Sequence, residues 1–163
     1  MSSKNKNLSQ AEGSRVPAAK GMRFGLVYAE WNHEITGALL AGAEKTLRKY
    51  GVSKKDILVH AVPGSFELTL GAQWLAAQKK IDAVICLGCV IQGETRHFDF
   101  ICDAVAHGIT GLNMKYNKPV IFGVLTTNNM GQARARAGGK HGNKGDEAAI
   151  TAIKMVALKR RSK

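Results

Sequence analysis

Four polar segments, each following an apolar run, contain the residues with the most obvious chemical potential. Together they hold a tryptophan, a phenylalanine, carboxylates, a histidine and several hydroxyl groups, and they span residues 30–32, 64–67, 92–97 and 126–128. Aromatic faces of this kind stack on flat rings, and the polar groups can hydrogen-bond to ring edges or hold an anion. The segments therefore predict a small-molecule site, which a purely structural domain would not need.

His97 is the candidate for proton transfer. It lies in the first or second turn of a predicted helix, where the positive end of the helix dipole disfavours an imidazolium. A neutral imidazole that exchanges protons near pH 7 is expected there, although position alone leaves a structural role open. The remaining histidines, His33, His60, His107 and His141, have no comparable position and are interpreted as structural or solvated.

Two neighbouring features have both a binding and a structural interpretation. The segment Gly93-Glu94-Thr95 opens the predicted helix, whose first N–H groups attract phosphate, but a single glycine does not decide the matter. The Glu94 carboxylate would also repel an anion unless it points away. Trp31 follows the first apolar run and could belong to the core. Its polar neighbours favour stacking on a heteroaromatic ring instead.

The three cysteines predict neither a metal site nor a disulfide. Cys86 and Cys89 form a CxxC pattern inside an apolar run typical of a strand. Residues three apart in a strand point to opposite faces, which suits neither zinc ligation nor a redox turn. Together with Cys102 they are interpreted as reduced, buried small hydrophobes.

The glycine-rich basic segment 134–145 resembles a P-loop only superficially. It lacks the spacing G-x-x-x-x-G-K-[ST] and does not follow a strand, so no nucleoside triphosphate site is predicted. An anion-binding turn or a subunit-packing turn remains open.

The elements that must position these residues are alternating strands and helices. Nearly continuous apolar runs at 22–29, 57–62, 82–91 and 119–126 predict parallel strands covered on both faces. Helical periodicity follows each run, and it is clearest from Phe98 to Leu112. Gly51 is a plausible C-cap and Ser65 a plausible N-cap. Such alternation predicts βαβ units with right-handed crossovers.

The expected fold is therefore α/β, a three-layer αβα sandwich with a flavodoxin-like four-stranded parallel sheet and helices on both faces. Residues 1–20 are expected to form a flexible N-terminal arm, 21–158 the single domain and 159–163 a basic C-terminal tail. Ligands of open α/β sheets bind at the carboxyl ends of the strands, where the four polar segments would lie.

Composition narrows the class of protein further. The 163 residues include no apolar run near the ~20 residues that a membrane span needs, and the first twenty lack a secretory signal. A cytoplasmic protein without membrane contact is expected. The formal charge of +12 is concentrated at the termini; it is interpreted as solvated, with attraction to polyanions or anionic substrates as the alternative.

Four motifs resemble those of the lumazine synthase family in order and spacing. They are PGSFEL at 63–68, LGCVIQGETRHFDF at 87–100, PVIFGVLTT at 119–127 and ARAGGKHGNKG at 135–145. The resemblance covers about residues 22–158. It implies condensation of 5-amino-6-(D-ribitylamino)uracil with 3,4-dihydroxy-2-butanone 4-phosphate to 6,7-dimethyl-8-ribityllumazine, phosphate and water, the penultimate step of riboflavin biosynthesis, with no metal or organic cofactor.

The resemblance also implies site residues by position. His97 would move protons. Trp31 would stack on the pyrimidine ring, where the family often has Phe. The other residues implied to bind ribitylaminouracil are Ser65, Phe66, Glu67, Cys89, Val90, Ile91 and, from a neighbouring subunit, Phe122. Those implied to hold the butanone phosphate are Glu94, Thr95, Arg136 and Lys144, with Glu147 at a nearby charged position.

Two positions depart from the family pattern. Many relatives have a small residue at Glu94, so contact there would be through the backbone N–H. Gln92 replaces a common Arg and removes one positive charge. Activity is expected to persist.

Two other classes of protein fit less well. A non-catalytic flavin-binding or cage protein on this scaffold would not need Glu67, His97 and Arg136. A nucleic-acid-binding protein would suit the charge, but no binding module is recognisable and the aromatics are not interleaved with basic residues. The expected partners are small-molecule substrates, with no nucleic acid.

The resemblance further implies a homo-oligomer. A ring of five is the minimum expected, because the family completes its pocket from the next subunit. The short glycine-rich turn at 138–142 resembles relatives whose pentamers close into icosahedral shells of sixty subunits, and a strand near 14–20 would add a contact. Riboflavin synthase is a further expected partner.

Overall fold

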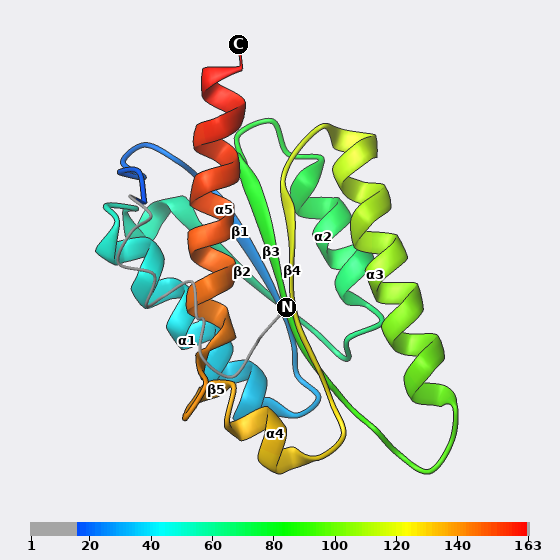
Figure 1. Ribbon diagram of the computed structural model, residues 1–163. Helices are drawn as coiled ribbons and strands as arrows, with labels where there is room; N and C mark the ends of the chain where they lie inside the picture. The colour runs from blue at the N-terminus through cyan, green and yellow to red at the C-terminus, as the bar shows by residue number, and fades with distance from the viewer. Residues whose placement is uncertain (1–15, 163) are drawn as a thin grey trace.

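The computed structural model describes residues 16–162 and contains one four-stranded parallel sheet (Figure 1). Its strands are β1 (Phe24–Ala29), β2 (Ile57–Val62), β3 (Ala83–Ile91) and β4 (Val120–Thr127), in the order β2-β1-β3-β4. Helices α1 (His33–Lys49) and α5 (Lys144–Arg161) cover one face, and α2 (Leu68–Ala76) and α3 (His97–Tyr116) cover the other. The predicted flavodoxin-like three-layer sandwich is confirmed.

The sequence pattern did not predict several smaller elements. They are a 3₁₀ turn η1 (Lys54–Asp56), the short helix α4 (Met130–Arg134) and a hairpin of β5 (Ala137–Gly139) with β6 (Gly142–Asn143). The hairpin occupies the glycine-rich segment, where Gly138 and Gly142 have φ values of 113° and 76°. Those angles favour glycine because other residues have a Cβ clash there.

The central strand β3 divides the core between two clusters. Its residues Ala83, Ile85, Leu87 and Cys89 pack with α1 and α5, whereas Val84 and Cys86 pack with α2 and α3. Alternate side chains of a strand point to opposite faces, so a continuous apolar run is what a strand covered on both sides requires. Cys86 and Cys89 belong to different clusters, as the alternation predicted.

Strand β2 departs from the prediction of strands covered on both faces. It lies at the edge of the sheet beside β1, and Val59, His60 and Ala61 are exposed. The expectation of full burial was wrong for this strand and for β4 at the other edge, where Phe122 is 42% exposed. An apolar run does not show whether a strand is central or at an edge.

Of the two predicted helix caps, the C-cap at Gly51 is confirmed and the N-cap at Ser65 is wrong. Gly51, just beyond α1, has φ 97°, and the N–H of Val52 donates to the Leu47 carbonyl, which confirms the predicted C-cap. Ser65 does not cap α2. That helix begins after Glu67, and the Ser65 hydroxyl is buried without a hydrogen-bond partner among the described residues.

The ends of the domain also differ from the expected boundaries. Residues 1–15 of the predicted arm and Lys163 lie outside the described residues. Residues 16–20 do not behave as a free arm: Ala19 is 0% exposed and its N–H donates to the Tyr50 carbonyl at 2.8 Å. Helix α5 continues through Arg161, so most of the predicted basic tail is helical.

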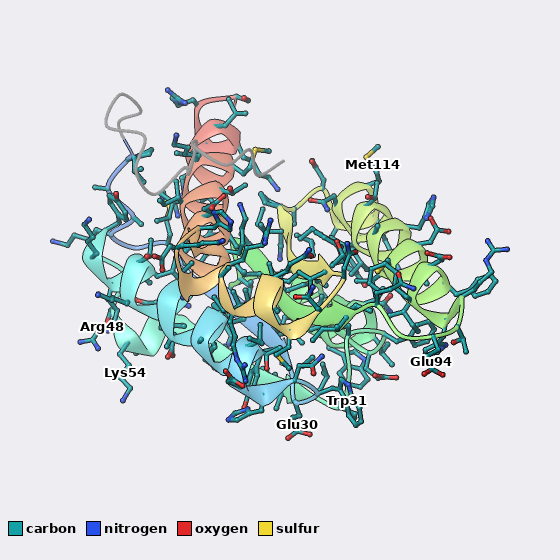
Figure 2. All side chains as sticks on the ribbon, turned by 60° about the horizontal axis from the view of Figure 1, so that its bottom comes forward. Glu30, Trp31, Arg48, Lys54, Glu94 and Met114 are labelled. Carbon is teal, nitrogen blue, oxygen red and sulfur yellow. The ribbon has the colours of Figure 1, made fainter. Side chains whose placement is uncertain are left out.

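Basic side chains gather at the amino-terminal edge of the sheet. They lie at the last turns of α1, α3 and α5 and in the loops before the strands, where cations complement the negative ends of helix dipoles. In Figure 2, Arg48 and Lys54 lie well away from Trp31 and Glu94, which mark the other edge. Within residues 16–162, no helix is long and apolar enough to cross a membrane.

Candidate active site

A cavity of about 820 Å³ opens at the carboxyl ends of β1, β2 and β3. The loop after each of these strands contributes to its wall, because parallel strands end at the same edge of a sheet. Its lining residues are Trp31, Asn32, Gly64, Ser65, Phe66, Glu67, Cys89, Val90, Ile91, Gly93, Thr95, His97, Phe98 and Ile101. Aromatic, carboxylate, imidazole and hydroxyl groups from distant segments therefore share one wall.

Trp31 stands at the mouth of this cavity with 73% of its surface exposed. Its loop is anchored through the backbone: the Trp31 N–H donates to the Pro63 carbonyl at 3.0 Å, and the Glu30 N–H donates to the Val62 carbonyl at 2.8 Å. Figure 2 shows Trp31 on the same side of the molecule as Glu94. An indole this exposed does not belong to the core, so its interpretation as a core residue is excluded.

The inner wall combines the end of β3 with the start of α2. Ser65 is buried, and a Cβ at Gly88 would lie 2.8 Å from its Oγ, so only glycine leaves that hydroxyl room. In the same loop, a Cβ at Gly64 would lie 3.1 Å from the Oε2 of Glu67. The Glu67 carboxylate therefore lies over Gly64, and the preceding residue Phe66 is exposed.

His97 is the first residue of α3 and its side chain is exposed at the cavity. The His97 backbone N–H donates to the Thr95 hydroxyl at 3.4 Å, which orients both residues at the helix start. Gly93 and Thr95 line the cavity, whereas the exposed Glu94 does not. The Glu94 side chain therefore lies outside the cavity wall.

A second cavity of about 550 Å³ lies over β4 and the start of α5. Its wall includes Phe122, Arg136, Lys144 and Glu147, and it shares no lining residue with the first. The Arg136 Nη1 donates to the Gln132 carbonyl at 3.0 Å. The Lys144 Nζ donates to both carboxylate oxygens of Glu147, at 2.8 and 2.7 Å.

Cys86 and Cys89 are not placed to share a metal ion or a disulfide. Cys86 and Cys89 are free thiols on opposite faces of β3, and burial raises the pKa of Cys86 to about 12 and that of Cys89 to about 11. Among the described residues, no group of three His, Cys, Asp or Glu side chains could hold a metal ion.

Comparison with known proteins decides the family. The family model described as 6,7-dimethyl-8-ribityllumazine synthase matches residues 21–160. Curated proteins of that name include one from Cytophaga hutchinsonii, 66% identical over 157 residues that cover 96% of this chain and 98% of the relative. Another, from Parabacteroides distasonis, is 56% identical over 156 residues, with coverage of 96% and 98%. One from Porphyromonas gingivalis is 56% identical over 154 residues, with coverage of 94% and 96%.

The chain belongs to the 6,7-dimethyl-8-ribityllumazine synthase family. The predicted family is thereby confirmed, and with it the prediction of an enzyme, a transferase of riboflavin biosynthesis. The predicted condensation of ribitylaminouracil with butanone phosphate is the reaction of lumazine synthases.

The fold brings together most of the site residues expected from the lumazine synthase motifs, but not all. Around the first cavity lie Trp31, Ser65, Phe66, Glu67, Cys89, Val90, Ile91, Thr95 and His97. Around the second lie Phe122, Arg136 and Lys144, with Glu147. Glu94 lines neither. One chain therefore presents two separate halves of the expected residue set.

Three cavity residues were missed or assigned elsewhere by sequence reasoning. Phe98 and Ile101 belong to the apolar periodicity that begins at Phe98 and predicted a packed helix face, yet both are only half-buried and line the first cavity. Their position in the first turn and a half of the helix, close to His97, was the available signal. Asn32 was noted only as a polar neighbour of Trp31.

Proposed function

We propose that the lumazine synthase condensation takes place at a site shared by two copies of this chain. The first cavity of one copy would bind 5-amino-6-(D-ribitylamino)uracil. Phe122, Arg136 and Lys144 of the next copy would close that cavity and hold 3,4-dihydroxy-2-butanone 4-phosphate against it.

The separation of the two cavities carries this proposal. They share no lining residue. The second cavity is built on β4 and α5 and is lined by Arg136 and Lys144, whereas His97 of α3 lines the first. Both substrates must meet for condensation, and an anion needs a cation nearby. Since the first cavity has no lysine or arginine in its lining, a second copy is the simplest source of positive charge.

Binding of the pyrimidine would use groups of three kinds. Trp31 would stack on the ring, and the exposed Phe66 would contact its ribityl side. Glu67 would accept hydrogen bonds from ribityl hydroxyls, with Ser65 beside it. The backbone of Cys89, Val90 and Ile91 would hydrogen-bond to the ring edge, and Phe122 would cover the ring from the neighbouring copy.

Binding of the phosphate would use the start of α3 together with the neighbouring cations. The N–H groups of Glu94 and Thr95, in the loop just before α3, would donate hydrogen bonds to the phosphate oxygens. Arg136 would donate a charge-assisted hydrogen bond to the phosphate, and Lys144 would be the second cation in the same wall. The Glu94 side chain, outside the cavity lining, would leave this approach free.

His97 would transfer protons during the reaction. The 5-amino group of the pyrimidine attacks the ketone, water leaves to give an imine, and phosphate is eliminated. The ribitylamino nitrogen then closes the ring on the remaining carbonyl, and a second water leaves. Each of the addition and elimination steps needs a proton moved, and the exposed imidazole at the cavity can accept or donate one. Positioning of the two substrates would supply much of the remaining acceleration, and general acid–base catalysis would add ~10²–10⁴-fold.

Mixed assemblies of two inactive variants test the shared site. His97→Gln would inactivate one half and Arg136→Ala the other, so neither variant alone turns over well. When the two are unfolded and reassembled together at equal amounts, about one quarter of the sites should combine intact His97 with intact Arg136. Recovery of roughly that fraction of wild-type turnover supports the proposal. No recovery, with assembly confirmed by mass, means that each site lies within one chain.

The same proposal extends to the assembly. A pentamer follows if each copy completes its neighbour's cavity around a closed ring. The hairpin of β5 and β6, with its two positive-φ glycines, is compatible with the compact turn associated with sixty-subunit shells. Association with riboflavin synthase and a cytoplasmic location stay predictions of the sequence.

A further inference from the structure

Among the described residues of the cavity wall, Asn32 alone links the loop after β1 to the end of β3 by a side-chain hydrogen bond. Its Nδ2 donates to the Cys89 carbonyl oxygen at 3.0 Å, across a separation of 57 residues in sequence. Both residues line the first cavity, and Trp31 precedes Asn32 directly.

The backbone of Asn32 explains why this side chain is free to reach β3. Its φ and ψ are 60° and 44°, the left-handed region that few non-glycine residues adopt. An ordinary N-cap asparagine bonds to its own helix, but this side chain makes no such bond. The Asn32 carbonyl instead accepts the N–H groups of Ile35 and Thr36, at 2.8 and 3.1 Å.

The Cys89 carbonyl lies beyond the last residue of β3 that pairs with β1. The last residue pair between β1 and β3 is Tyr28 with Leu87, and Cys89 lies beyond it. Asn32 therefore continues the connection between the two strands after their backbone ladder has ended. The opposite side of the loop is held by the Trp31 N–H on the Pro63 carbonyl.

We infer that Asn32 is a positioning residue that fixes the distance between the Trp31 ring and the end of β3. This inference rests on the proposed function, in which Trp31 stacks on the pyrimidine while Val90 and Ile91 bind its edge. A ring that contacts both at once needs the two walls at a constant spacing. The exposed indole makes few packing contacts that could set this spacing, so the Asn32 amide sets it.

Substitutions at Asn32 can separate the side-chain contact from the backbone conformation. Asn32→Gly keeps access to positive φ and removes the amide. Asn32→Asp keeps the side-chain shape and also tolerates positive φ. It replaces the amide donor by a carboxylate, which repels the Cys89 carbonyl oxygen. A matched control is Asn117→Gly, because Asn117 ends α3 far from the cavity with φ 44°.

Steady-state kinetics, Trp31 fluorescence and assembly mass test the inference. Asn32→Gly should raise KM for ribitylaminouracil roughly five- to tenfold, the equivalent of one lost hydrogen bond, and change KM for butanone phosphate less than about twofold. Asn32→Asp should raise KM for ribitylaminouracil more than Asn32→Gly does, because the substitution replaces a hydrogen bond by repulsion. Quenching of Trp31 fluorescence by bound riboflavin should require correspondingly higher ligand concentrations. Asn117→Gly should leave all three unchanged.

Contrary outcomes are distinguishable. An unchanged KM and quenching curve in Asn32→Gly, with active wild-type enzyme, overturns the positioning role alone. Loss of assembly in both Asn32 variants but not in Asn117→Gly also overturns it, because the residue would then serve folding. Inactive wild-type protein would instead contradict the proposed function.

Discussion

Lys144 and Glu147 form a closed ion pair in the wall of the second cavity. The Lys144 Nζ lies 2.8 and 2.7 Å from the two carboxylate oxygens of Glu147, and the two side chains are 20% and 13% exposed. Arg136, in the same wall, contacts the carbonyl of Gln132, which has no charge to cancel. The positive charge available to a phosphate at this wall is therefore chiefly that of Arg136.

This difference predicts unequal effects at the two cations. Arg136→Ala should raise KM for butanone phosphate about tenfold or more, because a charge-assisted contact is lost. Lys144→Ala should raise it less, and neither should change KM for the pyrimidine much. Arg134→Ala is the control, since Arg134 pairs with Glu34 at the surface instead. A larger effect at Lys144 than at Arg136 would contradict this order.

His97 should be separable from the other exposed histidine of the same helix. His97→Gln is expected to lower kcat about tenfold or more while riboflavin binding and assembly mass stay close to wild type. His107→Gln is the matched control, because the His107 ring contacts Asp103 and lines neither cavity. Equal kcat in both variants would remove His97 from the proton-transfer step.

The two tryptophans provide an optical test of stacking. Both are exposed, Trp31 at 73% and Trp74 at 64%, but only Trp31 lines the cavity. Binding of riboflavin or substrate should quench Trp31, because the rings would stack. Fluorescence titration of Trp74→Phe should keep the quenching, and Trp31→Phe should lose it. Quenching that survives in Trp31→Phe would refute the stacking assignment.

The contact between α1 and α5 predicts an unequal response of two helical glycines. A Cβ at Gly145 would overlap the Leu39 carbonyl oxygen, so Gly145→Ala must displace the start of α5 and with it Lys144. We expect destabilisation of about 1–3 kcal/mol in thermal or denaturant unfolding. Gly111→Ala, on exposed α3 with nothing near the added atom, should instead stabilise by about 0.4–1 kcal/mol. Equal effects would show that α1 and α5 are not in close contact.

Assembly mass should show the sixty-subunit shell. Gly138 and Gly142 shape the hairpin before α5 through their positive φ angles, and the resemblance of this short turn to shell-forming relatives carries the expectation. Mass photometry of the purified protein should give one dominant species at the mass of sixty chains. A single species at pentamer mass would rule out the shell while leaving the shared site possible.

Local pattern was sufficient for the four main strands and the helices between them, and it predicted which loops would border the first cavity. The apolar run of β3 predicted a buried strand, and its alternation placed Cys86 and Cys89 on opposite faces, as the two core clusters have them. Because parallel strands end at one edge, the loops after them predicted that Trp31, Glu67 and His97 would meet. These conclusions need only periodicity and strand direction, which neighbouring residues encode.

Tertiary structure decided what depends on strand order and on contacts between distant segments. The order β2-β1-β3-β4 makes β2 an edge strand and leaves Val59 exposed, although its apolar run resembles that of a central strand. His97 and Arg136 line separate cavities within one chain, because α3 and α5 pack on opposite faces of the sheet. The hydrogen bond from Asn32 to Cys89 also had no local signal. Each arises from packing between segments far apart in sequence, and no pattern within one segment specifies its neighbour.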